Sequence, residues 1–242
     1  MTDSVQRVSL DLTHVLYDSS SDTSFLLAVL TLSPILLMPA YAVLTVQTRE
    51  LTIINMWAGQ LISEGLNLVL KHVIKQERPA DAKLHLNGYG FPSSHSQFMG
   101  FFATFLICHL YYRHRFISTG WPLIDQLWRL FVYSALIIWA VGVAYSRLHL
   151  LYHTPHQVFW GFGIGAGLAL MQYFVTEYLP VQRPHSVFAN AKTAILTNPI
   201  STWLQIRDGW AIWPDSGREV EWKRWRLEWD DHRKLLQEKR LD

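Results

Sequence analysis

The hydrophobic and polar positions of the chain alternate between long apolar segments and short polar stretches. The clearest apolar segments are 24–46, 128–146 and 157–179. The first contains no Asp, Glu, Lys or Arg, the second carries only Arg129 and the third only Glu177. Helices of this length approach what is needed to cross a hydrocarbon layer roughly 30 Å thick at about 1.5 Å per residue. The pattern therefore predicts three membrane-spanning helices.

Two further segments, 51–70 and 97–112, give a weaker signal. The first contains polar side chains and the second is short. Polar residues within a membrane domain face its interior, so we expect both segments to line the inside of a bundle. The predicted fold class is all-α: a polytopic transmembrane helical bundle of about five spans with a cytosolic tail. Segment 157–179 also presents small residues that permit close helix approach, namely Gly161, Gly163, Gly165 and Gly167.

The same pattern predicts three regions. These are an N-terminal arm over residues 1–23, a transmembrane domain over 24–180 and a tail over 181–242, with Pro180 and Pro184 at the second boundary. In the tail, four apolar residues recur at helical spacing among charged ones, which is typical of a helix lying in the membrane interface: Trp222, Trp225, Trp229 and Leu236. The alternative is that these tryptophans pack against the tail's own Trp203, Trp210 and Trp213.

Composition and charge strengthen the membrane interpretation and add an orientation. The chain is 50% hydrophobic and contains 11 Trp, 12 Phe and 10 Tyr. With five spans, Lys and Arg number 15 on the side of the tail and 6 on the other side. The positive-inside rule then places the tail in the cytosol, and loops 71–96 and 147–156 on the lumenal or exterior face. The single cysteine, Cys108, excludes an internal disulfide, and residues 1–23 lack the pattern of a cleavable signal peptide.

Two polar clusters lie in the first of these loops. The stretch "KHVIKQERP", 71–79, places Lys71, Lys75 and Arg78 at the end of an apolar helix, and we expect Pro79 to stop that helix. In "GFPSSHSQF", 90–98, Ser94 and Gln97 have the form of a capping box. A helix that begins there directs backbone N–H groups outward and favours a bound phosphate. Capping does not explain His95. It lies in the first turn of the helix, where the helix dipole disfavours a positive charge unless an anion is bound nearby.

The third cluster is "SRLHLLYHTPHQ", 146–157. Thr154, Pro155 and Gln157 predict a second helix start, with His153 just before it. Two interpretations of Gln157 stay open: its amide acts only in the cap, or it also accepts a hydrogen bond from His153. His149 and His153, four residues apart, are alternative metal ligands, but no Asp, Glu or Cys in the loop completes a coordination shell. Together the clusters offer cations, helix N-termini and two histidines on one predicted face, as binding and transfer of a phosphate group require.

The order and spacing of these clusters resemble the three signature motifs of the type 2 phosphatidic acid phosphatase superfamily. The matching residues span 71–157 and are Lys71, Arg78 and Pro79; Pro92, Ser93, Ser94 and His95; and Ser146, Arg147 and His153. The resemblance implies hydrolysis of phosphate esters or diphosphates in a helical membrane bundle without a metal or other cofactor.

The resemblance also implies a role for each matching residue. His153 corresponds to the nucleophile and His95 to the general acid. The phosphate-binding cations would be Lys71, Arg78 and Arg147, and hydrogen bonds to the equatorial oxygens would come from Ser93 and from the backbone of Ser94 and His95.

Two positions depart from the usual motifs. Ser94 stands where the family usually has Gly, and Gln157 stands where it usually has Asp. An amide orients His153 but, unlike a carboxylate, does not stabilise a positive charge on it.

Within the superfamily, "GFPSSHSQFMGFF" and "SRLHLLYHTPHQV" are similar to the dolichyl diphosphatase branch. That similarity implies dolichyl diphosphate, or a similar lipid diphosphate, as substrate and the lipid bilayer as the other partner, with no nucleic acid. It also implies an endoplasmic reticulum membrane location with the active site facing the lumen, where the enzyme recycles the lipid carrier for N-glycosylation. The alternatives are a phosphatase for another lipid phosphate or polyprenyl diphosphate, and a non-catalytic protein that binds lipid phosphates.

Overall fold

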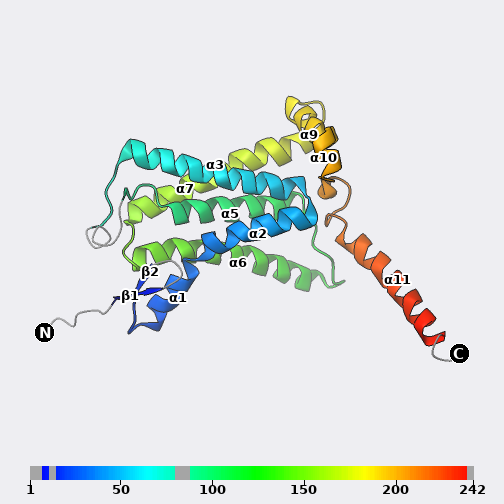
Figure 1. Ribbon diagram of the computed structural model, residues 1–242, viewed down its shortest axis with the longest axis horizontal. Helices are drawn as coiled ribbons and strands as arrows, with labels where there is room; N and C mark the ends of the chain where they lie inside the picture. Colours follow the sequence, from blue (N-terminus) through cyan, green and yellow to red (C-terminus); the bar gives the residue numbers. More distant parts are fainter. Residues whose placement is uncertain (1–6, 11–14, 80–87, 239–242) are drawn as a thin grey trace.

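The computed structural model describes residues 7–10, 15–79 and 88–238, and in them long helices run side by side as a bundle (Figure 1). The first helical segment is broken into two parts at Thr31 and Leu32. The bundle helices are α1 (Asp22–Leu30), α2 (Ser33–Thr48), α3 (Leu51–Ile74), α5 (Ser94–Tyr112), α6 (Pro122–His149) and α7 (Pro155–Tyr173).

Helix α5 occupies the centre of this bundle and packs against α7, α6 and α3. Phe98, Met99, Phe101 and Phe105 of this helix are almost completely buried. Segment 97–112 therefore lines the interior, as its sequence predicted. In α3, the side chains of polar residues also face inward and are buried, including Gln60, Ser63 and Asn67.

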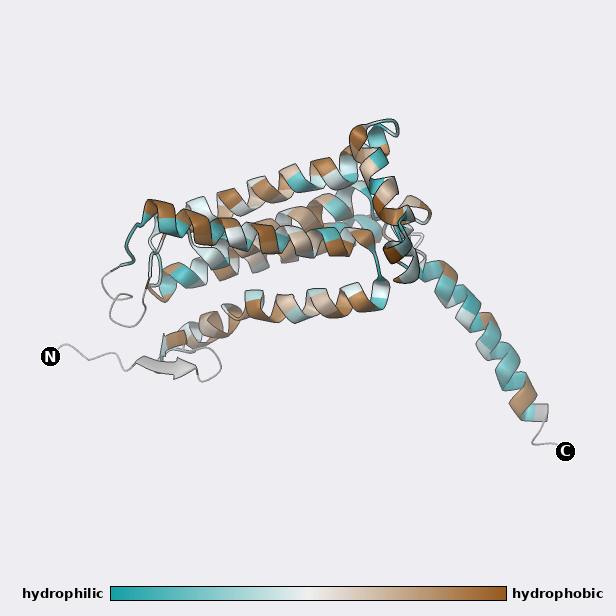
Figure 2. Cartoon of the chain, turned by 45° about the horizontal axis from the view of Figure 1, so that its top comes forward, coloured by the Kyte–Doolittle hydropathy of each residue, from teal (hydrophilic) through white to brown (hydrophobic). Residues whose placement is uncertain are grey.

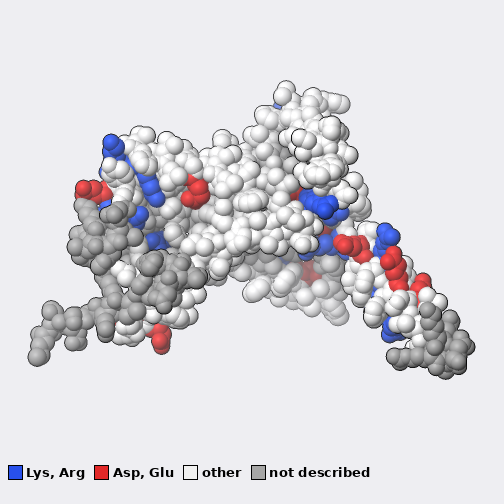
Figure 3. All heavy atoms as spheres, viewed as in Figure 1, with Lys and Arg blue, Asp and Glu red and all other residues white. Residues whose placement is uncertain are grey.

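Three helical runs are long and apolar enough to cross a membrane, judged by length and composition among the described residues. They are Asp22–Thr48, Pro122–His149 and Pro155–Gln182. These runs contain the three predicted segments, so that prediction is confirmed. The bundle helices carry mostly apolar positions (Figure 2), and Lys and Arg gather at the two ends of the face seen in Figure 3. This distribution is what a bundle surrounded by hydrocarbon requires, because charged side chains are costly at that depth.

The N-terminal region contains a small β-hairpin that the all-α expectation omitted. Strand β1 (Arg7–Leu10) pairs antiparallel with β2 (Val15–Asp18), and residues 1–6 and 11–14 of the predicted arm lie outside the described residues. Val15 is buried, and the backbone N–H of Leu16 donates to the hydroxyl of Tyr152 at 2.8 Å. Contact with the bundle therefore holds strands that are too short to be stable alone.

The helix that begins at Pro155 does not stop at Pro180. After α7 it continues through a π-helical turn, η1 (Phe174–Tyr178), into α8 (Leu179–Gln182). A proline inside an α-helix removes a hydrogen bond and clashes with the preceding turn, and a wider π-turn relieves both problems. The turn directs Glu177 inward, where Thr52, Asn55 and Lys192 donate hydrogen bonds to its carboxylate.

Most of the tail folds against the end of the bundle that contains the first residues of α3. Its elements are α9 (Val187–Thr197), α10 (Pro199–Trp203), the 3-10 turn η2 (Gly209–Ala211) and α11 (Arg218–Glu238). The buried carboxylate of Glu50, just before α3, accepts hydrogen bonds at 2.8 Å from the side chain of Arg207 and from the backbone N–H of Gly209.

Helix α11 extends away from the bundle and is polar along most of its length (Figures 1 and 2). Trp222, Trp225 and Trp229 are exposed, and the last two stack on each other with ring centroids 5.8 Å apart. The alternative that these tryptophans pack against Trp203, Trp210 and Trp213 is therefore wrong. The remaining tail residues, 239–242, lie outside the described residues.

Candidate active site

The three sequence clusters meet at one end of the bundle around a cavity of about 240 Å³. The end of α6 and the starts of α5 and α7 converge there (Figure 1). The polar lining residues are Thr31, Arg78, Ser94, His95, Arg147, Tyr152 and His153, and the apolar ones are Val15, Leu32 and Ile35. Both predicted histidines thus face the same small space, although 58 positions separate them in the chain.

The ring of His153 is held by the side chain of Gln157, which is completely buried. The amide nitrogen of Gln157 donates to the backbone carbonyl of Glu77 at 2.8 Å, and its oxygen Oε1 lies 3.1 Å from Nδ1 of His153. Because a carbonyl can only accept, the amide nitrogen must face Glu77 and the oxygen must face His153. His153 therefore donates through Nδ1–H, and its lone pair lies on Nε2, which is 3.5 Å from Nη1 of Arg78.

The surroundings of His153 keep its imidazole neutral. Burial lowers the pKa of His153, and the charges of Arg147 and Arg78 lower it further, to about 3, against the opposing effect of the hydrogen bond to Gln157. A neutral imidazole at physiological pH has a free lone pair. The geometry and the low pKa together make Nε2 of His153 available as a nucleophile.

The cavity carries an excess of positive charge. Arg147 is only 4% exposed and lies under the ring of Tyr152, 4.1 Å from its centroid. Within the described part of the chain, Nε and Nη1 of Arg147 and Nε of Arg78 are buried without a hydrogen-bond partner, and none of the residues lining the cavity is Asp or Glu. The ammonium of Lys71 lies 3.5 Å from the hydroxyl of Ser94 at the edge of the same site. Buried cations with unused donors fit a multiply charged anion such as a diphosphate.

The second cluster differs locally from its prediction. Ser94, the predicted N-cap, is instead the first residue of helix α5. The N-cap is Ser93, and no side chain caps the helix. Gln97 instead donates to the carbonyl of Ser63 at 2.6 Å and accepts from Asn67 at 2.8 Å, both on α3. The predicted capping box of Ser94 and Gln97 is therefore wrong, because buried polar groups of α3 use the side chain of Gln97.

Ser93 does not lie on the cavity wall. It is fully buried, and its hydroxyl accepts a hydrogen bond from Ser96 at 3.0 Å. The Ser93 backbone N–H donates to the carbonyl of Gln157 at 3.1 Å, which ties the second cluster to the third. Ser94 and His95 provide the lining of this part of the site.

The other helix boundaries give one confirmation and one correction. Thr154 and Gln157 form the predicted capping box at the start of α7, and Gln157 bonds His153 as well, so both interpretations of this residue hold together. Helix α3, in contrast, ends at Ile74 and not at Pro79. Lys75 adopts a left-handed conformation with φ of 53° and terminates the helix, and its side chain is exposed outside the site.

The alternative metal pair of His149 and His153 finds no third ligand. His149 is exposed at the end of α6, and the chain as described contains no group of three or more His, Cys, Asp or Glu arranged to hold a metal ion.

Two contributors to the site escaped the sequence analysis. Tyr152 covers Arg147 with its ring and binds the backbone of Leu16 through its hydroxyl, so it joins the hairpin to the cavity. Thr31 lines the cavity, and its hydroxyl lies 2.7 Å from that of Ser146. The apolar residues around Tyr17 give only a weak strand signal, and no local motif reports these long-range contacts.

A second cavity of about 220 Å³ adjoins the first. It shares Ile35, Ser94 and His95 with the first cavity and continues along α2 and α5 past Met38 and Phe98. Its walls are mainly apolar apart from Glu64. The site thus consists of a cationic chamber with an apolar extension beside it.

Comparison with known proteins agrees with this arrangement. Residues 52–179 match the family model described as the PAP2 superfamily. Dolichyldiphosphatase 1 of Mus musculus is 36% identical over 81% of this chain and 80% of its own length. The dolichyldiphosphatase of Saccharomyces cerevisiae is 36% identical over 69% of this chain and 70% of its own length.

One solved structure shares the fold: the transmembrane PAP2 type phosphatidylglycerolphosphate phosphatase from Bacillus subtilis. It aligns with a TM-score of 0.52 at 20% identity, over 67% of this chain and 78% of that protein. The matched family model covers all three clusters that surround the cavity. This chain is a multi-pass membrane protein that belongs to the PAP2 superfamily.

Proposed function

We propose that this protein hydrolyses dolichyl diphosphate to dolichyl phosphate and inorganic phosphate through a phosphohistidine intermediate. The observation that carries the proposal is the arrangement of His153, whose Nε2 lone pair faces Arg78 inside a cavity rich in buried cations. The substrate is suggested by relatives that are named dolichyldiphosphatases and align over most of this chain.

In the first step, Nε2 of His153 attacks the terminal phosphorus. A nitrogen–phosphorus bond forms while the bond from phosphorus to the bridging oxygen breaks, and His95 gives a proton to that oxygen. Burial and the charge of Arg147 lower the pKa of His95, so its ring takes up this proton together with the bound diphosphate, whose negative charge favours the imidazolium. Dolichyl phosphate leaves. Lys71, Arg78 and Arg147 bind the phosphate oxygens, with the backbone N–H groups of Ser94 and His95 at the start of α5. Such preorganised charge provides most of the acceleration in phosphoryl transfer.

In the second step, water attacks the phosphohistidine. His95, now neutral, takes a proton from that water as the new oxygen–phosphorus bond forms and the bond to His153 breaks. Inorganic phosphate leaves and both histidines return to their starting protonation states. Throughout, Gln157 keeps Nδ1–H of His153 engaged, so that Nε2 is the reacting nitrogen in each cycle.

The apolar cavity along α2 gives the first isoprene units a path from the cationic chamber toward the lipid. It begins at His95, the residue that protonates the departing dolichyl phosphate. We place this end of the bundle on the lumenal face of the endoplasmic reticulum membrane and the tail in the cytosol. Exposed Trp222, Trp225 and Trp229 then bring α11 to the cytosolic membrane interface.

The direct test replaces the nucleophile. We expect purified His153→Ala protein to release no phosphate from dolichyl diphosphate while its circular dichroism spectrum stays unchanged. His149→Ala is the matched control, because His149 is exposed nearby and lies outside the cavity, and it should keep wild-type turnover. Hydrolysis by His153→Ala at the wild-type rate would contradict the mechanism.

The same assay separates the rival functions. Competition between dolichyl diphosphate, phosphatidic acid and a shorter polyprenyl diphosphate in detergent micelles identifies the preferred lipid. Turnover that survives EDTA supports the histidine mechanism, whereas loss of turnover indicates a metal. A protein that binds these lipids without releasing phosphate would be a non-catalytic lipid-phosphate-binding protein.

A further inference from the structure

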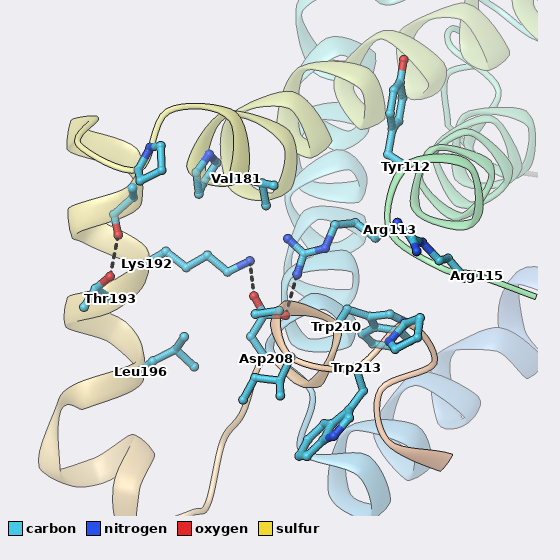
Figure 4. A pocket seen from close by; sticks show the side chains of 16 residues that line it. Tyr112, Arg113, Arg115, Val181, Lys192, Thr193, Leu196, Asp208, Trp210 and Trp213 are labelled. Atoms are coloured by element: carbon cyan, nitrogen blue, oxygen red, sulfur yellow. Dashed lines mark hydrogen bonds and ion pairs between the residues drawn. The ribbon is translucent and has the colours of Figure 1, made fainter. Parts of the chain in front are cut away.

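The largest cavity that we describe, about 630 Å³, lies at the opposite end of the bundle from the candidate active site. It is bounded by the end of α5, by α8 and α9, and by the segment around η2 (Figure 4). Three of its lining residues are Lys or Arg and one is a carboxylate: Arg113, Arg115, Lys192 and Asp208.

One of these cations has an unused donor. Nη2 of Arg113 donates to Asp208 at 2.8 Å, but Nη1 is buried and has no hydrogen-bond partner in the described part of the chain. The Arg113 side chain is only 6% exposed. In Figure 4 its second terminal nitrogen points away from Asp208. A buried donor of a charged group is costly when unpaired, so an acceptor in this cavity would be strongly favoured.

The single carboxylate is shared by two cations. Lys192 lies 2.8 Å from Asp208 on the side opposite Arg113 (Figure 4). It also lies 2.9 Å from the buried carboxylate of Glu177, which does not line the cavity. Burial by itself would raise the pKa of Asp208, but Lys192 and Arg113 lower it overall, so this group is ionised. Even with Glu177 counted, the cations outnumber the carboxylates, and Arg115 approaches the cavity from the side of α5 (Figure 4).

We propose that this cavity binds the phosphate group of an anionic lipid headgroup. Arginine and lysine are the side chains that bind phosphate oxygens most strongly. Exposed Arg115 lines the cavity, and the buried, unpaired Nη1 of Arg113 supplies a second donor at its wall. The apolar wall formed by Val181, Leu196 and Ile212 accommodates the start of the acyl chains.

The position of the cavity favours a lipid over a soluble anion. It lies where α5 ends at Tyr112 and where the α7–α8 run ends at Gln182, the level at which spanning helices meet headgroups. Trp210 and Trp213 lie on its wall, and tryptophan is enriched at that level of a membrane. A bound headgroup would join α5 to α9 and the segment around η2, and so hold the tail against the bundle.

The test uses the full chain in detergent micelles and native mass spectrometry. The probe is phosphatidylinositol, whose phosphodiester offers no terminal phosphate to the active site, and phosphatidylcholine is the zwitterionic comparison. We expect phosphatidylinositol to bind more tightly than phosphatidylcholine. We expect Arg113→Gln and Arg115→Gln each to weaken phosphatidylinositol binding about tenfold, because each variant loses one charge-assisted hydrogen bond.

Arg129→Gln is the matched control, because Arg129 is an exposed arginine of α6 outside the cavity and its loss changes the net charge equally. Arg115 is exposed, so its variant remains informative if Arg113→Gln does not fold. Equal binding of the two lipids, or equal loss in Arg129→Gln, would overturn the site. Loss in Arg78→Gln alone would show that the lipid occupies the active site. The headgroup assignment would also be overturned if the protein bound inorganic phosphate through Arg113 and Arg115 but did not bind phosphatidylinositol.

Discussion

At the scale of single residues, Gln157 shows how this site orients His153, the proposed nucleophile, without a carboxylate. Its oxygen faces Nδ1 of His153 and the backbone N–H of Thr154, and its nitrogen donates to the carbonyl of Glu77. A carboxylate supplies the first two contacts but has no proton for the third. The amide therefore holds the first and third clusters together, which Asp or Glu at this position does not do.

Replacing Gln157 by Glu tests this account with little change in side-chain length. The variant places a negative charge beside the imidazole, so we expect the pKa of His153 to rise from about 3 toward the ordinary value of about 6.5. The wild-type ring should stay neutral as the pH falls from 7 to about 4, whereas the variant ring should gain a proton in that range. The ring nitrogen shifts of ¹⁵N-histidine-labelled protein report the change.

The control is Gln157→Leu, which removes the hydrogen bonds without adding charge. We expect its His153 to stay neutral over the same pH range, but with the reacting nitrogen no longer fixed, its kcat should fall by about 10²-fold. Identical titration of His153 in the wild type and in Gln157→Glu would contradict the proposed contact.

Residue-scale predictions succeeded where the partners are close in sequence. The capping box of Thr154 and Gln157 needs only two positions three apart, so the pattern reports it directly. The partners of Gln97 are Ser63 and Asn67, at least 30 positions away in the sequence. No local sequence pattern indicates that its side chain will form hydrogen bonds with α3. The contact between Tyr152 and Leu16 was missed for the same reason.

At the scale of elements, the contact between α5 and α7 sets the geometry of the site. A β-carbon at Gly165 would lie 2.0 Å from the carbonyl oxygen of Gln97, and one at Gly161 would lie 2.6 Å from that of Ser93. Gly163 and Gly167, in contrast, have nothing within 4 Å. Only two of the four predicted small residues therefore form the close contact, because residues four apart share a helix face whereas residues two apart do not.

This difference supplies a matched pair of variants on one helix. Gly165→Ala forces the backbones of α5 and α7 apart and should destabilise the protein by at least about 1–3 kcal/mol, as overpacking does in cores. Gly163→Ala adds the same methyl group to an exposed position and should leave stability unchanged or raise it slightly. Thermal unfolding in detergent compares the two. An equal effect of both substitutions would show that the helices are not in close contact there.

The N-terminal hairpin is the element that sequence patterns predicted least well. Its strands are four residues long and are held by the bundle, so their own sequence carries little signal. The spanning helices were predictable because length and hydropathy can be read from a continuous segment of sequence, and the thickness of the hydrocarbon layer sets both.

Tyr152→Phe tests whether the hairpin is fixed through this contact. The variant loses the acceptor for the Leu16 N–H but keeps a ring over Arg147. A hydrogen bond contributes about 0.5–1.5 kcal/mol, so the Leu16 amide should exchange with deuterium up to about tenfold faster. Tyr152→Leu also removes the ring and should additionally weaken substrate binding. Unchanged exchange in Tyr152→Phe would show that other contacts hold the hairpin.

At the scale of the whole molecule, the two ends of the bundle hold different groups of residues. One end holds His95, His153 and the cations that surround them, and the other holds the folded tail and the larger cavity. Charge indicates which end faces the cytosol, since the side of the tail carries 15 of the Lys and Arg residues and the other side 6. The proposal that the active site faces the lumen rests on this asymmetry and on the odd number of predicted spans.

Cysteine labelling tests that orientation, and the chain is well suited to it because Cys108 is the single cysteine. In a Cys108→Ser background, Lys223→Cys places a thiol on exposed α11, and His149→Cys places one at the exposed end of α6 beside the active site. In sealed microsomes, a maleimide that does not cross membranes should label Lys223→Cys at once and His149→Cys only after detergent is added. Each variant serves as the control for the reactivity of the other. If His149→Cys were labelled at once and Lys223→Cys only after detergent is added, the active site would face the cytosol. A dolichyl diphosphate pool on the lumenal leaflet would then be beyond its reach.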